Sequence, residues 1–227
     1  MKYDVTVIGS GPGGYIAAVR CAQLGMKTAI IEKYDTLGGT CLNVGCIPSK
    51  ALLDSSEHYH NAAHTFQEHG IELNDLKVNF KQMIERKTQV VNQVTSGVDF
   101  LMKKNKIDVF HGMGSFIDKN TIKVTDAAGK ETKVETEKAI IATGSKPSSL
   151  PFIKIDKKRV ITSTEALKLE EIPKHLVVIG GGVIGLEMGQ VFLRLGSKVS
   201  VVEYADSMIA AMDGELGKTL QRVLKKQ

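Results

Sequence analysis

The chain has 227 residues, of which 42% are hydrophobic and 24% are charged; this is the composition of a globular protein with one large domain or two small ones. Its net charge of +5 comes from basic residues scattered among acidic ones, and only 5% of its residues are aromatic, so a nucleic-acid-binding surface is not expected. No run of roughly 18 apolar residues predicts a membrane span. Three cysteines are too few for a secreted disulfide scaffold.

The chain enters its first predicted strand, Val5–Ile8, almost at once. We therefore expect no signal peptide and predict a cytoplasmic protein. A processed organellar protein would have the same composition, so this alternative stays open.

A strand–loop–helix–strand unit opens the chain and returns near its end. A short apolar strand leads into the glycine-rich loop 9–14, a helix follows, and a second apolar strand ends on Glu32. The same order returns with the loop 180–185 and with Glu203, and the offsets 180 − 9 and 203 − 32 both equal 171. Two copies of one βαβ unit are the simplest explanation.

The two loops have the glycine spacing of a dinucleotide-binding fingerprint. The first glycine permits a tight turn, the second lets the backbone approach a pyrophosphate, the third lets helix and strand pack closely, and the acid binds a ribose. One such loop is also compatible with a simple turn, but two copies in the same context predict two bound dinucleotides. The residues assigned to these sites are Gly9, Gly11, Gly14 and Glu32, and in the second unit Gly180, Gly182, Gly185 and Glu203.

Glu203 also indicates which dinucleotide the second unit takes. A carboxylate at this position bonds a free 2′-hydroxyl but repels a 2′-phosphate, and the next three residues include no Arg. We therefore predict NAD rather than NADP.

The rest of the chain supports a coarser prediction. Residues 50–69 predict a helix rich in His, and residues 80–104 predict an amphipathic helix with one apolar stripe. Residues 121–143 predict short antiparallel strands, and the proline-containing stretch 145–174 predicts a connection between domains. No metal site is predicted, because a solvated helix face explains the histidines better.

Between the two copies, Cys41 and Cys46 lie in the segment GGTCLNVGCIPSK. A disulfide needs Cα atoms within about 7 Å, and residues five apart in a regular helix are about 8.6 Å apart. Bridging them therefore requires an irregular turn, which Asn43 and Gly45 tolerate. A zinc site would need more ligands, and the third cysteine, Cys21, is expected on the first unit's helix, facing its sheet. A redox-active pair at the start of a helix fits a reducing compartment best, while two unrelated thiols stay open as the alternative.

The segment GGTCLNVGCIPSKALL resembles the active-site segment of the pyridine nucleotide–disulfide oxidoreductases, above all that of the dihydrolipoamide dehydrogenases among them. GSGPGGYIAA, ATGSKP and GGGVIGLE resemble the same family in the same order, so the resemblance covers the whole chain. It implies an α/β fold of two Rossmann-like units, an FAD domain with an inserted NAD domain, both incomplete, with a small antiparallel meander. We predict an FAD-binding domain over residues 1–148 and an NAD-binding domain over residues 149–227.

The resemblance also implies roles for individual residues. Cys46 matches the flavin-proximal sulfur, which forms a charge-transfer thiolate when reduced, and Cys41 matches the interchange sulfur that meets the substrate. Lys50 matches a lysine beside the isoalloxazine ring that pairs with a glutamate, here Glu187; without the resemblance it would be an ordinary solvated lysine. Further positions assigned to the FAD site are Lys33, Gly39, Thr40, Gly114, Thr143, Gly144 and Ser145. On sequence alone, Gly114 and residues 143–145 would be simple turns.

The implied reaction is the oxidation of dihydrolipoamide by NAD⁺, through the Cys41–Cys46 disulfide and FAD. The implied partner is the dihydrolipoyl group of a 2-oxoacid dehydrogenase or glycine cleavage complex, with a homodimer in the full-length family. The alternatives are a glutathione- or mercuric-reductase-like enzyme and a non-catalytic FAD-binding protein. The family's acid–base histidine lies in a further segment that nothing here matches, so we expect an N-terminal part that is inactive alone.

Overall fold

The computed structural model describes residues 2–227, which fold into two compact units. The first unit is the chain up to Pro48 together with Thr88–Ser148, and the second is Ser49–Lys87 together with Ser149–Gln227. Helices α3 (Cys46–His64) and α4 (Phe80–Lys104) contribute to both. The division of the chain into an FAD and an NAD domain at residue 148 stays a prediction.

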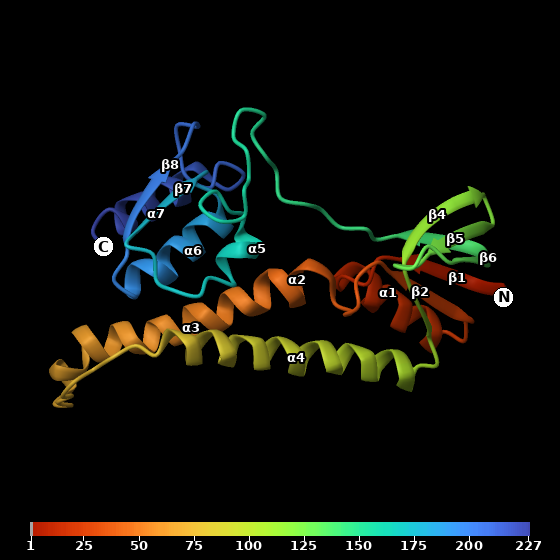
Figure 1. Ribbon diagram of the computed structural model, residues 1–227, viewed down its shortest axis with the longest axis horizontal. Coiled ribbons are helices and arrows are strands. Elements are labelled where there is room, and N and C mark those ends of the chain that lie inside the picture. The colour runs from red at the N-terminus through yellow and green to blue at the C-terminus, as the bar shows by residue number, and fades with distance from the viewer. Residues whose placement is uncertain (1) are drawn as a thin grey trace. The chain divides into compact units, whose positions relative to one another are not determined.

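The first unit is built on a six-stranded sheet in the order β3-β2-β1-β6-β5-β4 (Figure 1). Strands β3, β2, β1 and β6 run parallel, as dinucleotide-binding units require, while β6, β5 and β4 are antiparallel. The predicted meander therefore extends the same sheet. The strands are β1 (Lys2–Ile8), β2 (Thr28–Glu32), β3 (Asp108–His111), β4 (Met113–Asp118), β5 (Thr121–Thr125) and β6 (Glu131–Ile141).

Two apolar clusters hold this sheet together. One joins Val7 and Ile30 to Ala18 of α1 (Pro12–Gln23) and to Met102 of α4. The other lies among β1, β2 and the meander, around Tyr3, Ile31, Ile122, Val124 and Val134. Every residue of β2 is buried, because a parallel strand inside such a sheet is covered on both faces. Each fully buried aliphatic side chain contributes about 1.5–3 kcal/mol.

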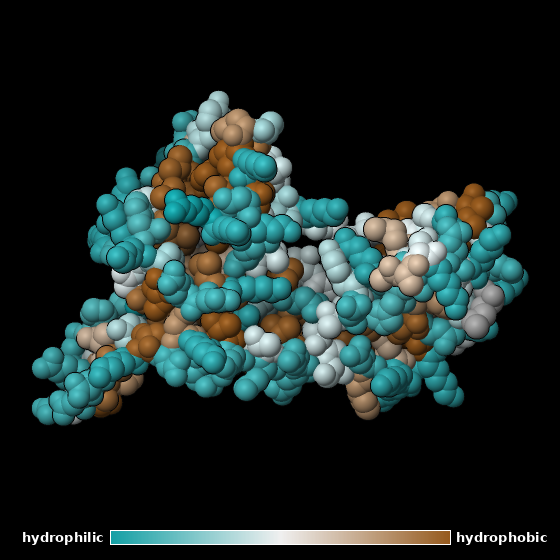
Figure 2. All heavy atoms as spheres, viewed as in Figure 1, coloured by the Kyte–Doolittle hydropathy of each residue, from teal (hydrophilic) through white to brown (hydrophobic). Residues whose placement is uncertain are grey.

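The second unit contains a parallel strand pair and five α-helical segments. Strands β7 (His175–Ile179) and β8 (Lys198–Val202) flank α6 (Val183–Arg194), and the other segments are parts of α3 and α4, α5 (Ser163–Ala166) and α7 (Gly214–Leu224). The predicted helix 50–69 ends earlier, at His64, and a short 3-10 turn follows over Phe66–His69. Exposed apolar side chains gather over the strand pair (Figure 2), where Val177, Ile179 and Val202 are 53%, 57% and 56% exposed.

The sequence repeat is also a repeat of contacts. Val5 pairs with Thr28 in β1–β2, and Leu176 pairs with Val199 in β7–β8, each 171 positions on from its counterpart (176 − 5 and 199 − 28). The loop amides at 9 and 180 donate to the carbonyls of residues 31 and 202, both at 2.8 Å. The prediction of two βαβ units of the same design is confirmed. Among residues 2–227, none of the helices has the length and apolar character that crossing a membrane requires.

Candidate functional site

The three glycines of the first loop meet three different steric demands. Gly9 has φ +99°, and a Cβ there would lie 2.3 Å from the carbonyl oxygen of Ala142. Gly14 is packed against the end of β1, because its Cβ would lie 1.8 Å from the carbonyl oxygen of Gly9. Gly11, by contrast, faces space: the nearest atom to a Cβ there would be the Gly39 Cα, 3.9 Å away. Two glycines therefore bring helix, strand and loop together, while the middle one leaves room for a ligand.

The second loop repeats this pattern with more space around it. Gly180 has φ +102°, and a Cβ on Gly180 or Gly182 would meet nothing within 4 Å. A Cβ on Gly185 would lie 2.7 Å from a methyl group of Val178 and 3.0 Å from the Gly180 carbonyl oxygen. Helices α1 and α6 begin after Gly11 and Gly182, and neither has a side-chain cap in the described chain. A helix start without a side-chain cap, behind a glycine with open space beside it, fits a pyrophosphate at both loops.

Each ribose acid also braces its own loop. Glu32 is buried, and its Oε2 accepts hydrogen bonds from the amide (2.9 Å) and the hydroxyl (2.6 Å) of Ser10, while its Oε1 accepts from the amide of Tyr34 (3.1 Å). The glycine fingerprint did not predict these hydrogen bonds, because it assigns the acid only to the ribose. A carboxylate has about four acceptor positions, so capacity for a ribose hydroxyl remains.

Glu203 repeats these contacts in the second unit. It accepts from the amide of Gly181 and from that of Ala205 at 2.7 Å. The amide of Ala205, and then that of Gly181, hold the pKa of Glu203 below its usual value of 4.5. The carboxylate is therefore ionised at neutral pH, which is the state that repels a 2′-phosphate.

The cysteine segment is attached directly to the first loop. The amide of Gly38 donates to the carbonyl oxygen of Ser10 at 3.0 Å and lies 3.1 Å from its hydroxyl. A Cβ on Gly39 would lie 2.5 Å from the Cα of Gly11, so the two backbones touch. Helix α2 (Gly39–Val44), which carries Thr40 and Cys41, thus begins against the residues that face the proposed pyrophosphate.

Asn43 holds this segment in shape. Its amide group donates to the carbonyl oxygens of Leu37 (3.0 Å) and Gly39 (2.9 Å), and its carbonyl accepts from the Thr36 hydroxyl at 2.8 Å. Sequence reasoning treated Asn43 only as a residue that tolerates a turn. The signal that it missed is a polar amide inside a short segment of glycines, whose backbone groups need partners.

Gly45 forms the irregular turn between α2 and α3. It has φ −139° and ψ −119°, and Cys46 is the first residue of α3. A Cβ at Gly45 would lie 2.8 Å from the carbonyl oxygen of Thr40 and 3.1 Å from the Cα of Cys41. The turn thus folds the chain back onto Cys41 immediately before Cys46. Cys46 is exposed and Cys41 half-buried; no disulfide is formed within residues 2–227, and the pairing of the two stays a prediction.

Lys50 and Glu187 meet in the second unit. The Lys50 Nζ lies 2.6 Å and 2.8 Å from the two carboxylate oxygens of Glu187, which is on α6. Their side chains are 59% and 24% exposed. Lys50 follows Cys46 by four residues, about one turn of α3.

The remaining predicted positions lie near the ends of the first unit's strands or in the loop that follows. A Cβ on Gly114 would lie 3.3 Å from methyl groups of Ile8 and Ile31, at the ends of β1 and β2. The Thr143 Cα would lie 3.1 Å from a Cβ on Gly9. Gly144 has φ +70°, and Ser145 follows it in an exposed loop. Lys33 lies with its Nζ 4.5 Å from the centre of the Tyr34 ring.

Metal-ligating side chains do not converge in the part of the chain that the structure describes, residues 2–227. His60 and His64 do share a face of α3, with ring centres 4.6 Å apart. Two rings without a third ligand do not make a metal centre.

The comparisons with known proteins agree on one family. The family model described as "Pyridine nucleotide-disulphide oxidoreductase" matches residues 3–227. The mitochondrial dihydrolipoyl dehydrogenase 1 of Arabidopsis thaliana is 52% identical over 99% of this chain and 44% of its own length. A leghemoglobin reductase of Vigna unguiculata is 53% identical over 99% of this chain and 43% of its own. The solved HOCl-induced flavoprotein disulfide reductase RclA of Escherichia coli has a TM-score of 0.82 and 30% identity, over 99% of this chain and 47% of its own.

These comparisons confirm the predicted family, the α/β fold and the cofactors FAD and NAD(H), which proteins of this family use. The relatives named as dihydrolipoyl dehydrogenases are oxidoreductases, as predicted. The chain spans less than half the length of the curated relatives that it matches.

The predicted cytoplasmic location is wrong. Relatives from Arabidopsis thaliana, Pisum sativum and Schizosaccharomyces pombe are named as mitochondrial, which points to the mitochondrion. The prediction rested on the absence of a signal peptide before the first strand, and a processed organellar protein has the same features.

Proposed function

The chain belongs to the pyridine nucleotide–disulfide oxidoreductase family, and from this premise we propose that it supplies the FAD loop, the NAD loop and the redox cysteines of an NAD-linked dihydrolipoamide dehydrogenase. The names of relatives about 50% identical over nearly the whole chain support the substrate. Bound FAD supplies two-electron transfer between a thiol pair and NAD⁺.

The attachment of the cysteine segment to the first dinucleotide loop carries this proposal. Gly38 is hydrogen-bonded to Ser10, and Gly39 touches Gly11, so α2 starts where a bound pyrophosphate would lie. Gly45 then folds the chain back so that Cys46 follows Cys41 across a tight turn. A binding protein without chemistry has no need to fix a cysteine pair to its nucleotide loop.

The two cysteines have different tasks in this proposal. One thiolate of dihydrolipoamide attacks the Cys41 sulfur of the Cys41–Cys46 disulfide, forming a mixed disulfide and releasing Cys46 as a thiolate. The second substrate thiol then displaces Cys41, which leaves the cyclic lipoamide disulfide, a reduced cysteine pair and two protons. Cys46 is the first residue of α3.

We propose a role toward the flavin for Lys50 and Glu187, as the resemblance implies. The ammonium group of Lys50 stabilises negative charge that develops beside it on reduction, and Glu187 orients and partly neutralises it. On the NAD side, the ionised Glu203 selects a free 2′-hydroxyl. The other positions proposed to line the cofactors are Lys33, Gly39, Thr40, Gly114, Thr143, Gly144 and Ser145 for FAD.

The wider setting is proposed from the relatives alone. A mitochondrial dihydrolipoamide dehydrogenase would act on the dihydrolipoyl group carried by a 2-oxoacid dehydrogenase or glycine cleavage complex. We also propose that the protein works as a homodimer, as the resemblance implies.

The test of the cysteine pair detects the Cys46 thiolate by its absorption. The FAD-loaded chain is reduced anaerobically with dithionite, and we expect a charge-transfer absorption between the Cys46 thiolate and the flavin. Cys46→Ser should abolish this absorption, while Cys41→Ser should show it before any reduction, because Cys46 then has no disulfide partner. Absence of the absorption in the flavin-loaded wild type would overturn the assignment of the cysteine pair.

The substrate is tested separately in single-turnover mixing of the same oxidised protein with dihydrolipoamide. We expect the substrate to reduce the bound flavin once, although the chain alone is not expected to sustain turnover. If dithionite produces the absorption and dihydrolipoamide does not, the cysteine assignment stands and the substrate is wrong. Because one relative is named leghemoglobin reductase, ferric leghemoglobin is tested separately as an oxidant of the reduced protein.

A further inference from the structure

The Lys50–Glu187 pair has a counterpart two turns farther along the same two helices. Glu57 of α3 forms an ion pair with Arg194 of α6. The offsets are equal, since 57 − 50 and 194 − 187 are both 7. Seven residues are two helical turns, about 10.5 Å along the axis. The second pair therefore lies on the same side of each helix as the first, and the two helices run in the same direction.

The charges alternate in a way that fixes how the helices are aligned. Helix α3 presents Lys50 and then Glu57, and α6 presents Glu187 and then Arg194. A slip of one turn moves each partner by about 5.4 Å and breaks both pairs. A slip of two turns brings together two carboxylates or two cations, depending on its direction, and like charges repel. Only the observed register satisfies all four groups.

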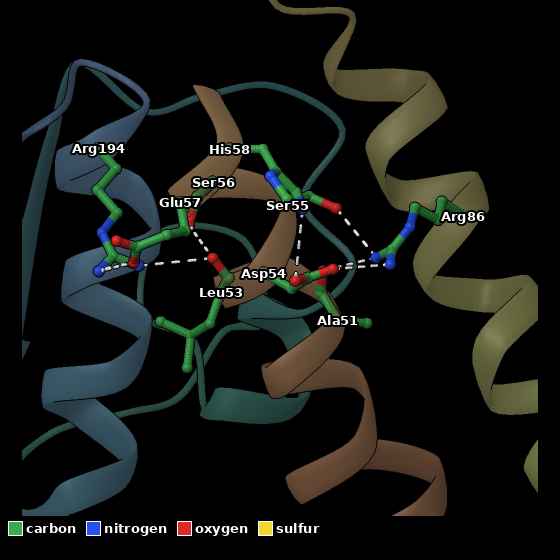
Figure 3. A network of polar contacts seen from close by, with 9 residues as sticks. All are labelled: Ala51, Leu53, Asp54, Ser55, Ser56, Glu57, His58, Arg86 and Arg194. Atoms are coloured by element: carbon green, nitrogen blue, oxygen red, sulfur yellow. Dashed lines mark hydrogen bonds and ion pairs between the residues drawn. The ribbon is translucent and has the colours of Figure 1, made fainter. Parts of the chain in front are cut away.

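Arg194 is held more firmly than a surface residue. Its side chain is 16% exposed, and its guanidinium also lies 3.5 Å from the carbonyl oxygen of Leu53, one turn before Glu57 (Figure 3). The neighbouring Phe192 is fully buried and lies against Phe80 of α4. The aliphatic part of the Arg194 side chain is therefore largely buried, while its guanidinium bonds to groups of α3. Arg194 thus holds α6 against α3.

The other side of α3 has a matching anchor. Arg86 of α4 donates to the carbonyl oxygen of Ala51 (3.0 Å), to the hydroxyl of Ser55 (3.1 Å) and to the carboxylate of Asp54 (2.8 Å). Figure 3 shows the two arginines approaching the same turns of α3 from opposite sides. Of these two arginines, Arg194 joins α3 to α6, the helix that carries Glu187, whereas Arg86 joins α3 to α4. Arg86 therefore provides a control.

We propose that Glu57 and Arg194 are positioning residues that hold the Glu187 carboxylate against the Lys50 amine, and so set the charge that Lys50 presents to the flavin. The inference rests on the proposed function, because it needs Lys50 beside the flavin. Arg194 and Glu57 touch neither cofactor nor substrate in this account; they act through the register of α6 on α3.

The test measures the midpoint potential of bound FAD by dye equilibration in the FAD-loaded protein. Removing the carboxylate in Glu187→Gln leaves the Lys50 cation without its partner, which favours the reduced, negatively charged flavin and raises the potential. Arg194→Gln should raise it in the same direction and by no more. In the double variant the potential should equal that of Glu187→Gln, because Arg194 acts only through Glu187.

Two further variants separate positioning from general stability. Arg86→Gln should lower the urea midpoint of unfolding but leave the flavin potential at the wild-type value. Arg194→Lys keeps a cation opposite Glu57 and the Leu53 carbonyl oxygen, and it should keep the wild-type potential, even if Arg194→Gln folds poorly.

The outcomes are distinguishable. If Glu187→Gln raises the potential and Arg194→Gln does not, or if their effects add, the positioning role is wrong while the proposed function stands. A potential in Arg194→Lys that is raised as far as in Arg194→Gln would also overturn it. If Glu187→Gln itself leaves the potential unchanged, Lys50 is not beside the flavin; that part of the proposed function then fails, and the positioning role fails with it.

Discussion

Replacing Gly14 with Ala tests the steric reading of the first dinucleotide loop. The added methyl would lie 1.8 Å from the carbonyl oxygen of Gly9 and 2.9 Å from its carbonyl carbon. The loop cannot simply retreat, because the Gly9 amide is hydrogen-bonded to Ile31 and the other side of Gly9 is packed against Ala142. The start of α1 must therefore move away from the end of β1.

The expected cost follows from two opposing effects. Overpacking a tight site costs typically about 1–3 kcal/mol and occasionally more. We expect a cost near the upper limit here, because the added methyl clashes with backbone atoms of Gly9, which cannot move as a side chain can. Alanine is favoured over glycine in a helix by roughly 0.5–1 kcal/mol. The net loss is about 2 kcal/mol, or roughly thirtyfold in the ratio of folded to unfolded protein.

Gly13 provides the matched control, because it is the neighbouring helical glycine and a Cβ there would meet nothing within 4 Å. Gly13→Ala should therefore be neutral or stabilising by up to about 1 kcal/mol. Urea unfolding followed by circular dichroism compares the free energies of unfolding of the two variants. FAD titration compares how tightly their first loops bind the cofactor. If the two variants agree within about 0.5 kcal/mol, a difference too small for a named packing mechanism, the reasoning from the clash is refuted.

Three other variants test the second loop and a buried phenol. Gly185→Ala should destabilise by only about 1 kcal/mol in the same urea assay, because its methyl would lie 2.7 Å from a Val178 methyl group and 3.0 Å from the Gly180 carbonyl oxygen, a milder clash than the 1.8 Å at Gly14; a loss as large as that of Gly14→Ala would contradict this. Glu203→Gln should reduce the preference for NADH over NADPH in binding titrations by about tenfold, since it removes the charge that repels the 2′-phosphate. Because the pKa of Glu203 is lowered, its bonds to the loop stabilise the fold above pH 4.5 and are lost as the pH falls through the folded-state value; unfolding of the Gln variant should depend less on pH there. Burial, followed by the hydrogen bond to Asp108, raises the pKa of Tyr3 from 10.0 to about 12. The protonated phenol therefore stabilises the fold up to pH 10.0, and this contribution is lost as the pH rises through about 12; Tyr3→Phe should remove one late step from the ultraviolet titration, and an unchanged titration would refute the assignment.

The sequence by itself determined those features that depend on local steric and chemical demands. The two glycine loops were predicted residue by residue, because only glycine permits φ near +100° at residues 9 and 180, or a backbone contact as close as that at Gly14. The helix predicted over 80–104 is α4, Phe80–Lys104, since an amphipathic stripe of that length has one stable conformation. The turn that a Cys41–Cys46 bridge requires was foreseen from the glycine at 45 for the same reason.

Tertiary structure alone decided which distant polar groups meet. Periodicity marks the charged residues of α3 as surface positions, but it does not show that Glu57 forms an ion pair with Arg194 of α6. The bracing of each loop by its ribose acid, the joining of the meander to the parallel strands and the grouping of residues 49–87 with the second unit were likewise absent from the sequence prediction. A glycine's conformation is limited by its own backbone, whereas the partner of a charge depends on the register of two packed helices, which the packing of many side chains sets together.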